Sequence, residues 1–267
     1  SASQLTLPPT ANTTDGAKAK YIIRFEDRLI LAGIANEPTK VLISGRVPFH
    51  ERFDAAGGGG YIFVDPDTGD HITGLGIWRG KIIVFKENSV WEITLATVTV
   101  GNFLLLAPTY QLITASQGCS SNRTIVSVNN DLFFSNNKGI FILGQQPNVA
   151  ADRLWTNELS AKIRPFFDSL TSTDLMNACG EYFDYKYVLA FPTSKKVIIF
   201  DRERGAFMGP WNTTFGINKL ERITDSSNID RLLAIDSTDN FVSEFSKSLT
   251  DDKGTAFTTL LKTRKED

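Results

Sequence analysis

Residues Ile72–Leu95 read ITGLGIWRGKIIVFKENSVWEITL and contain three short apolar runs separated by polar turns. β-branched and aromatic residues dominate the runs, and each is too short for the three- and four-residue spacing of a helix. The turns are Arg79-Gly80 and Glu87–Ser89, whose Gly, Asn and Ser are typical turn residues. The stretch therefore predicts three consecutive antiparallel strands. They are expected at Thr73–Ile77, Lys81–Phe85 and Val90–Ile93.

The same order of strands and turns recurs along the chain. Residues 124–143, TIVSVNNDLFFSNNKGIFIL, repeat it with turns of Asn, Asp and Gly, which tolerate the positive φ of tight hairpins. Weaker copies begin near Tyr21, Cys179 and Ile223, so the period is about fifty residues, in the range of propeller blades. We therefore expect an all-β protein, a β-propeller with five blades of three to four antiparallel strands. The expected blades lie near residues 19–60, 61–115, 120–150, 177–215 and 220–264 of a single domain, 19–267, after an N-terminal arm, 1–18.

Several connecting segments carry expectations of their own. Tyr61–Val64 reads as a strand that opens the second blade, and Val98–Leu106 and Tyr110–Ile113 read as two further strands that lead into the third. Closed propellers commonly complete one blade with strands from both ends of the chain, which removes an exposed edge. We expect Phe257–Arg264 or Gln4–Leu7 to supply that strand.

Leu154–Leu170 departs from the β pattern, because apolar residues recur there at helical spacing. A short helical insertion is expected near residues 155–170, with a helix that ends near Arg164 and a second turn that starts at Pro165, where proline is tolerated. Its apolar stripe is expected to pack on the rim of the β domain, and the alternative is a helix that binds a partner.

Composition excludes several classes of function. The chain has 267 residues, a formal net charge of −2 and 22% charged residues, so it lacks the basic excess that drives tight nucleic-acid binding. No apolar run approaches the roughly twenty residues of a membrane-spanning helix, and Ser1–Gly16 lacks the pattern of a secretion signal. Cys119 and Cys179 are expected to be small buried residues rather than a disulfide or a pair of metal ligands.

Catalytic and metal-binding patterns are missing from the sequence. His50 and His71 have no Cys or His at ligand spacing, and the acidic turn Asp65–Asp70 lacks the calcium-loop pattern, so we expect a solvated turn. No phosphate-binding loop is present, because Gly57–Gly60 has no Lys-Ser/Thr after it. We expect no catalytic residue, no metal and no cofactor, and hence no enzyme. Four aspartates lie at or near turns, the positions at which hairpins ordinarily carry aspartate: Asp27, Asp131, Asp184 and Asp236. A glycosidase would need two such carboxylates close together.

The candidate interaction site is a long loop, Arg46–Gly60, which reads RVPFHERFDAAGGGG. Its glycine run is expected to be flexible, either to span distance or to form a mobile contact loop. Trp78 is a further candidate contact residue, because it is an aromatic residue expected in a turn. The candidate contact residues are Phe49, His50, Arg52, Phe53, Gly57, Gly58 and Trp78.

Residues 72–93, followed by QGCSSNRTIVSVNNDLFFSNNKGIFIL at 117–143, resemble a β-propeller family of tailed bacteriophages. The members of this family are tail and packaged-DNA stabilisation proteins, including nozzle components of short-tailed phages. The loop VLISGRVPFHERFD at 41–54 and the segment 154–170 look like the family's connections. The resemblance covers roughly residues 21–170, and the chain is shorter than such proteins and lacks the domains that flank their propeller.

The resemblance implies a non-enzymatic virion protein that is assembled in the host cytoplasm and becomes part of the phage tail. Its implied partners are further copies of itself in a ring around the tail channel and adjacent tail or portal-proximal proteins, with transient non-specific contact with DNA. The main alternative is a carbohydrate-binding or glycoside-hydrolysing five-bladed propeller used in host adsorption. A third is a cellular protein-interaction propeller, although no Trp-Asp repeat signature is present.

Overall fold

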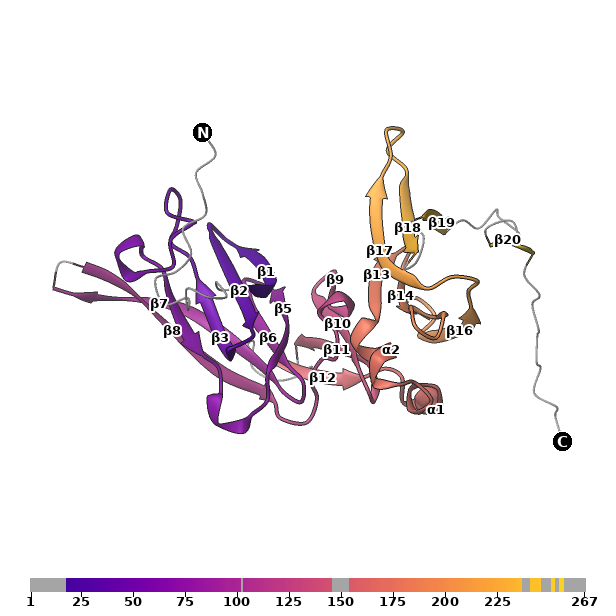
Figure 1. Ribbon diagram of the computed structural model, residues 1–267, viewed down its shortest axis with the longest axis horizontal. Coiled ribbons are helices and arrows are strands. Elements are labelled where there is room, and N and C mark those ends of the chain that lie inside the picture. Colours follow the sequence, from indigo (N-terminus) through magenta and orange to yellow (C-terminus); the bar gives the residue numbers. More distant parts are fainter. Residues whose placement is uncertain are drawn as a thin grey trace. The chain divides into compact units, whose positions relative to one another are not determined.

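The computed structural model describes residues 18–101, 103–145, 154–236, 241–245, 251–252 and 255–256 (Figure 1). The chain divides into two compact units, with the boundary between Met176 and Asn177. The N-terminal arm, Gln4–Leu7 and Phe257–Arg264 lie outside the described residues, apart from Lys18 at the end of the arm. The single domain expected over 19–267 stays a prediction.

The first unit begins with a four-stranded antiparallel sheet whose strand order follows the chain. Its strands are β1 (Ala19–Phe25), β2 (Arg28–Ile34), β3 (Glu37–Ile43) and β4 (Gly60–Phe63), with a 3-10 turn, η1 (Ala55–Gly57), between the last two. β4 pairs with β3, so that Lys40 lies opposite Phe63. The strand expected to open the second blade therefore closes the first sheet instead, because the loop before it returns the chain to the edge of β3.

The second sheet contains the three strands predicted from residues 72–95. It consists of β5 (Ile72–Trp78), β6 (Lys81–Lys86), β7 (Val90–Val100) and β8 (Phe103–Thr114), after a 3-10 turn, η2 (Pro66–Thr68). Arg79 and Gly80 form the β5–β6 turn with φ of 43° and 75°, the positive values that a two-residue hairpin needs.

The strands expected at Val98–Leu106 and Tyr110–Ile113 have other bounds in the structure. β7 continues to Val100, the chain turns at Gly101, and β8 runs unbroken from Phe103 to Thr114, so that Val98 lies opposite Leu105. Alternating Thr and Val favour the extension of β7. Pro108 is accommodated within β8 because β8 is an edge strand of its sheet.

The third sheet confirms the strand order predicted from residues 124–143. The helix predicted from Leu154 onward is partly wrong. Leu154–Glu158, expected as helix, is a strand that pairs with residues 141–145, and its exposure alternates as on a half-buried strand. The helical insertion starts later, and Pro165 lies in the first turn of a helix as expected. The elements are η3 (Asn122–Thr124), β9 (Val126–Val128), β10 (Asp131–Asn136), β11 (Gly139–Gln145), β12 (Leu154–Glu158), η4 (Ala161–Ile163), α1 (Arg164–Asp168) and α2 (Ser172–Asn177).

The second unit contains two larger sheets and a short ribbon, all antiparallel. Its first sheet has four strands in chain order, and its second has three described strands. The elements are β13 (Cys179–Phe183), β14 (Lys186–Phe191), β15 (Lys196–Asp201), β16 (Ala206–Asn212), β17 (Ile217–Thr224), β18 (Asp230–Asp236), β19 (Val242–Phe245), β20 (Asp251–Asp252) and β21 (Thr255–Ala256).

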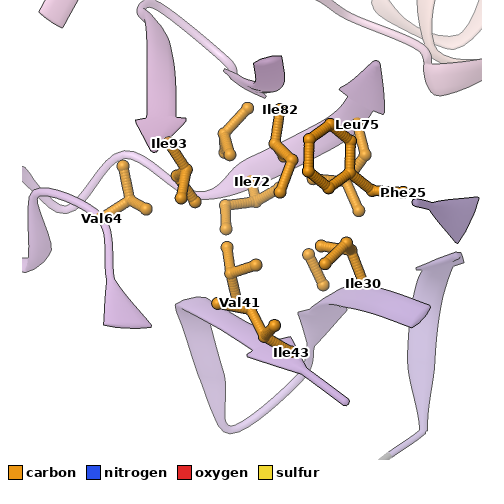
Figure 2. Close-up of a cluster of buried hydrophobic side chains, with 11 residues drawn as sticks. Phe25, Ile30, Val41, Ile43, Val64, Ile72, Leu75, Ile82 and Ile93 are labelled. Atoms are coloured by element: carbon orange, nitrogen blue, oxygen red, sulfur yellow. The ribbon is translucent and has the colours of Figure 1, made fainter. Parts of the chain in front are cut away.

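The continuous apolar run of β6 is buried on both faces, as a strand between two other sheets must be. Ile82 packs with Ile30 and Val41 of the first sheet (Figure 2), and Val84 belongs to the same cluster. Ile83 and Phe85 pack with the third sheet. Successive sheets of this unit therefore stack face to face. In the second unit, residues of β14 and β15 share one core with residues of β17 and β18.

The expected all-β fold class is thus confirmed. Its repeating element is the four-stranded antiparallel sheet with strands in chain order, which is the form of a propeller blade. The closed ring of five blades stays a prediction.

Candidate functional site

The loop between β3 and β4 is a folded, hydrogen-bonded structure. The amide of Gly45 donates to the carbonyl oxygen of Arg52 at 2.7 Å, and that of Gly59 donates to Asp54 at 2.9 Å. The Asp54 carboxylate also caps η1, because Oδ1 accepts from the Gly57 amide at 2.7 Å. The expectation of a flexible glycine run is therefore wrong at the described residues of this loop.

The glycines of the loop allow close backbone packing. A Cβ on Gly59 would lie 2.8 Å from the carbonyl oxygens of Arg52 and Ile43, and a Cβ on Gly57 would lie 2.7 Å from the Cβ of Arg52. Gly58 has open space around it and a φ of +72°, which favours glycine for conformational reasons. Gly57 and Gly58 thus shape the loop, and their role as contact residues stays a prediction.

Arg52 and Phe53 serve the loop in different ways. The Arg52 guanidinium pairs with the Asp54 carboxylate at 3.0 Å and lies over the Phe49 ring at 5.8 Å. The pKa of Asp54 is lowered, first by the Gly57 amide and then by Arg52. Phe53 is only 6% exposed and packs against the apolar face of the first sheet with Ile34 and Leu42. Phe53 is therefore a core residue, and its expected role as a surface contact is wrong.

The large exposed side chains of the loop lie in its first half. Val47 and Phe49 are 68% and 46% exposed, and His50 is also exposed. Beneath them lies an open cavity of about 180 Å³. Its lining residues are Arg24, Asp27, Arg28, Leu29, Val47 and His50. Both signs of charge occur in this lining, so it does not select an anion or a cation by charge alone.

Arg28 holds the loop on the first sheet, and the sequence analysis did not single it out. Its Nη1 atom donates to the carbonyl oxygens of Ser44 and Gly58, at 2.5 and 2.7 Å. Burial lowers the pKa of Arg28, and the nearby charge of Arg46 lowers it further. The only sequence signal was a charged residue at the head of an otherwise apolar strand.

Trp78 is the last residue of β5 and is 5% exposed, so the expectation of an accessible turn aromatic is wrong. It packs in the core shared by the second and third sheets, and its Nε1 donates to the carbonyl oxygen of Asn130. The sequence-predicted contact residues are therefore split, since Trp78 and Phe53 are buried whereas Phe49 and His50 are exposed.

The acidic turn before β5 is held by protein groups. Lys86 is fully buried, and its Nζ donates to the Asp65 carbonyl oxygen at 2.9 Å and to Thr68 Oγ1 at 3.2 Å. Asp70 accepts from the Ser89 hydroxyl at 2.9 Å. These bonds hold the turn in place, so no bound ion is needed to explain where its carboxylates lie.

Other candidate groups are also engaged in structural contacts. His50 and His71 lie 3.7 and 3.5 Å from the carboxylates of Glu51 and Glu87. Within the described ranges, no group of three or more His, Cys, Asp and Glu residues could hold a metal ion. Both cysteines are free and buried, as predicted. None of the helices in the described part of the chain is both long and apolar enough to cross a membrane.

The four aspartates expected at or near turns, two of which a glycosidase would need together, lie in turns and at strand ends. Asp184 accepts from Lys186 at 3.1 Å in the β13–β14 turn, and Asp236 is buried at the end of β18. Asp27 lines the open cavity beside two arginines, and Asp131 opens β10. Their positions agree with the ordinary use of aspartate in hairpins.

No protein-family model and no curated protein matches the chain. Among solved structures, one that is similar to part of it is the crystal structure of BBS1N in complex with ARL6DN. That similarity has a TM-score of 0.33 at 10% sequence identity, and it covers 82% of this chain and 75% of the other.

Proposed function

We propose that the chain is a non-enzymatic structural subunit of a phage tail, of the nozzle or packaged-DNA stabilisation type. Copies of it surround the tail channel, contact adjacent tail or portal-proximal proteins, and touch the DNA transiently and without sequence preference. Its place is the virion. The proposal begins from the resemblance of residues 21–170 to phage tail propellers, and the residues with the best resemblance form two stacked sheets.

The observation that most supports this function is the chemistry of the exposed surface. Large apolar side chains are exposed on the loop after β3 and on the β7–β8 hairpin, at Val47, Phe49, Val98 and Val100. The ionisable groups described above, by contrast, are used in ion pairs, turns and caps. A surface of this kind suits protein contacts, whereas catalysis would need reactive groups brought together in a cleft.

Native mass spectrometry of the purified chain, with negative-stain images of the same sample, tests the proposal. We expect closed rings with a single copy number. A chain that stays monomeric at all accessible concentrations would contradict a ring formed by this chain.

Carbohydrate binding is the rival function, and the exposed aromatic pair on β4 is where it would be sought. Tyr61 and Phe63 are 51% and 38% exposed and lie edge to face at 5.7 Å. The Lys40 Nζ lies 4.6 Å from the Tyr61 ring centroid and 5.5 Å from that of Phe63, so it occupies ring faces on which a sugar would stack. A glycan-binding screen with the intact chain tests this rival, and a specific hit lost in Tyr61→Ala would favour it.

A further inference from the structure

The guanidinium group of Arg28 is only partly used by the fold. Arg28 is 7% exposed and lines the open cavity beneath the loop after β3. Its Nη1 atom donates to two carbonyl oxygens, those of Ser44 and Gly58. Its Nε and Nη2 atoms donate to no residue in the described part of the chain. A buried arginine therefore keeps N–H groups that have no protein acceptor there.

These N–H groups lie on one edge of the guanidinium plane. Nε–H and one Nη2–H of an arginine point side by side and form a fork that matches the two oxygens of a carboxylate. Leaving a buried donor without an acceptor costs free energy, and the cost is larger for a charged group. The Arg28 fork thus needs an acceptor, and the cavity is the space in which one can bind.

The charges that act on Arg28 favour a bound anion. Burial lowers the pKa of Arg28, the charge of Arg46 lowers it further, and the charge of Glu26 opposes both. The Glu26 carboxylate lies 3.5 Å from Arg46 Nη2, so it is shared with a second cation. Asp27 is the one acid among the described residues of the cavity lining, and it forms no ion pair with Arg28. An anion beside the fork would stabilise the charged form of Arg28.

The size and the apolar side of the cavity limit what this anion can be. The cavity volume of about 180 Å³ is below the roughly 300 Å³ at which pockets for drug-sized ligands begin, so only a group of a few atoms fits. Leu29 and Val47 add aliphatic side chains to the lining. A carboxylate on a short aliphatic stem satisfies both parts, with its oxygens on the fork and its methylene groups against these two side chains.

We propose that this cavity binds a carboxylate on a short aliphatic stem, which Arg28 receives through Nε and Nη2. Such a group belongs to a free short-chain carboxylic acid or to an acidic side chain of another protein, and the chemistry of its recognition is the same. The proposal does not depend on a ring, because all residues of the cavity belong to one unit of one chain.

The test uses two pairs of probes, each a carboxylate with its uncharged isostere. Butyrate and butyramide form the first pair, and glutamate and glutamine with blocked amino and α-carboxyl groups form the second. Each is titrated into the isotopically labelled intact chain at neutral pH and constant ionic strength, and NMR spectroscopy records the Arg28 Nε–H signal. We expect a saturable shift of this signal with the carboxylates and none with the amides.

Val47→Asp tests the position of the site without disturbing Arg28, which holds the loop. Val47 is 68% exposed, so the fold tolerates aspartate there, and the new charge lies in the cavity lining. Its repulsion should weaken butyrate binding at least about tenfold. Val100→Asp is the matched control, because Val100 is 57% exposed and lies outside this lining, and it should bind butyrate as the wild type does. Circular dichroism and thermal melting verify that both variants fold.

Saturable shifts with both carboxylates, weakened in Val47→Asp and unchanged in Val100→Asp, would support the site. The same pattern with butyrate alone would support it with a free acid as the source of the carboxylate, and with blocked glutamate alone it would support a protein side chain as the source. The site would be overturned by the lack of a saturable shift with either carboxylate, by equal shifts with the amides, or by unchanged affinity in Val47→Asp.

Discussion

The indole Nε1 of Trp78 donates to the carbonyl oxygen of Asn130, 52 residues further along the chain. This bond joins the end of β5 in the second sheet to the β9–β10 turn of the third. The carbonyl group accepts it at the edge of a core in which Trp78 is only 5% exposed.

Trp78→Phe keeps an aromatic ring in this core and removes the donor. We expect it to lower the free energy of unfolding by about 1–3 kcal/mol, because the hydrogen bond to Asn130 is lost and the smaller ring fills the core less completely. Urea denaturation monitored by circular dichroism measures the change. Trp155→Phe is the control, since Trp155 Nε1 also donates to a carbonyl oxygen but the residue is 36% exposed. An equal loss in both variants would contradict this account.

Lys86→Met tests whether the buried ammonium group holds the turn before β5. Three oxygen atoms accept from Nζ, on Val64, Asp65 and Thr68, and methionine supplies no donor. We expect a loss of about 3 kcal/mol in unfolding free energy, since hydrogen bonds to charged groups are among the strong ones. Lys219→Met, which removes an exposed ion pair with Glu221, should cost less than about 1 kcal/mol. Chemical denaturation of both variants compares the two losses of unfolding free energy.

The packed loop after β3 predicts different outcomes at neighbouring glycines. Gly59→Ala places a methyl group within 2.9 Å of three backbone atoms, so we expect a loss of about 3 kcal/mol. Gly58→Ala meets no atom within 4 Å and pays only for its positive φ, about 1 kcal/mol. Thermal melting of the two variants compares them. Equal, negligible effects would show that the loop is the flexible linker expected from its glycines.

Glu181 should make the stability of the second unit depend on pH. Burial raises the pKa of this carboxyl, with the charge of Glu221 adding to the shift, while the Tyr182 amide and Arg222 oppose it. A raised pKa means that the protonated form favours the folded state, so the contribution is complete below the ordinary glutamate pKa and is lost as the pH rises through the folded value.

Glu181→Gln is therefore expected to raise the melting temperature at pH 7, and the gain should vanish once the pH falls below the ordinary glutamate range. Thermal melts of wild type and variant across pH 3–8 measure the difference in melting temperature at each pH. Glu203→Gln, at an exposed turn position, is the control and should show no such trend. A gain that is the same at every pH would rule out titration of Glu181 as its cause.

Cys119 should not react in the folded protein. It is fully buried, and burial raises the pKa of its thiol to about 11, although hydrogen bonds with Thr124 and Ser121 act in the other direction. At pH 8 the reactive thiolate is therefore scarce as well as inaccessible. Titration with a thiol reagent should detect no Cys119 before denaturation and both cysteines after it. Rapid labelling of Cys119 in the native chain would contradict the burial.

The parts of the fold that the sequence predicts well are those with local causes. Arg79-Gly80 makes a hairpin turn from adjacent residues, and Ile82–Phe85 is too short and too apolar for anything but a strand buried on both faces. The parts that were mispredicted depend on distant partners. Leu154–Glu158 alternates like a strand but precedes a helical pattern, and only its pairing with β11 determines where the helix begins.

The candidate site shows the same division. Exposed Phe49 and His50 follow from their place in a polar loop, whereas Phe53 is buried because the loop folds back on the first sheet, where Arg28 holds it. Arg28 and Gly58 are 30 residues apart, so no local pattern indicates that bond. Trp78 was placed in a turn because its neighbours are turn residues, and its partner lies in another sheet.

Two glycines of β5 limit which sheets of this chain could be exchanged for one another. A Cβ on Gly74 would lie 2.4 Å from Ile125 Cδ1, and one on Gly76 would lie 3.1 Å from Leu132 Cδ1, so the third sheet fits against the second only where these side chains are missing. The sheets share a strand order, yet they are not interchangeable modules. A gene in which the third sheet were exchanged for the first would lose the match between Gly74 and Ile125, and recombination between repeats should rarely yield a folded protein.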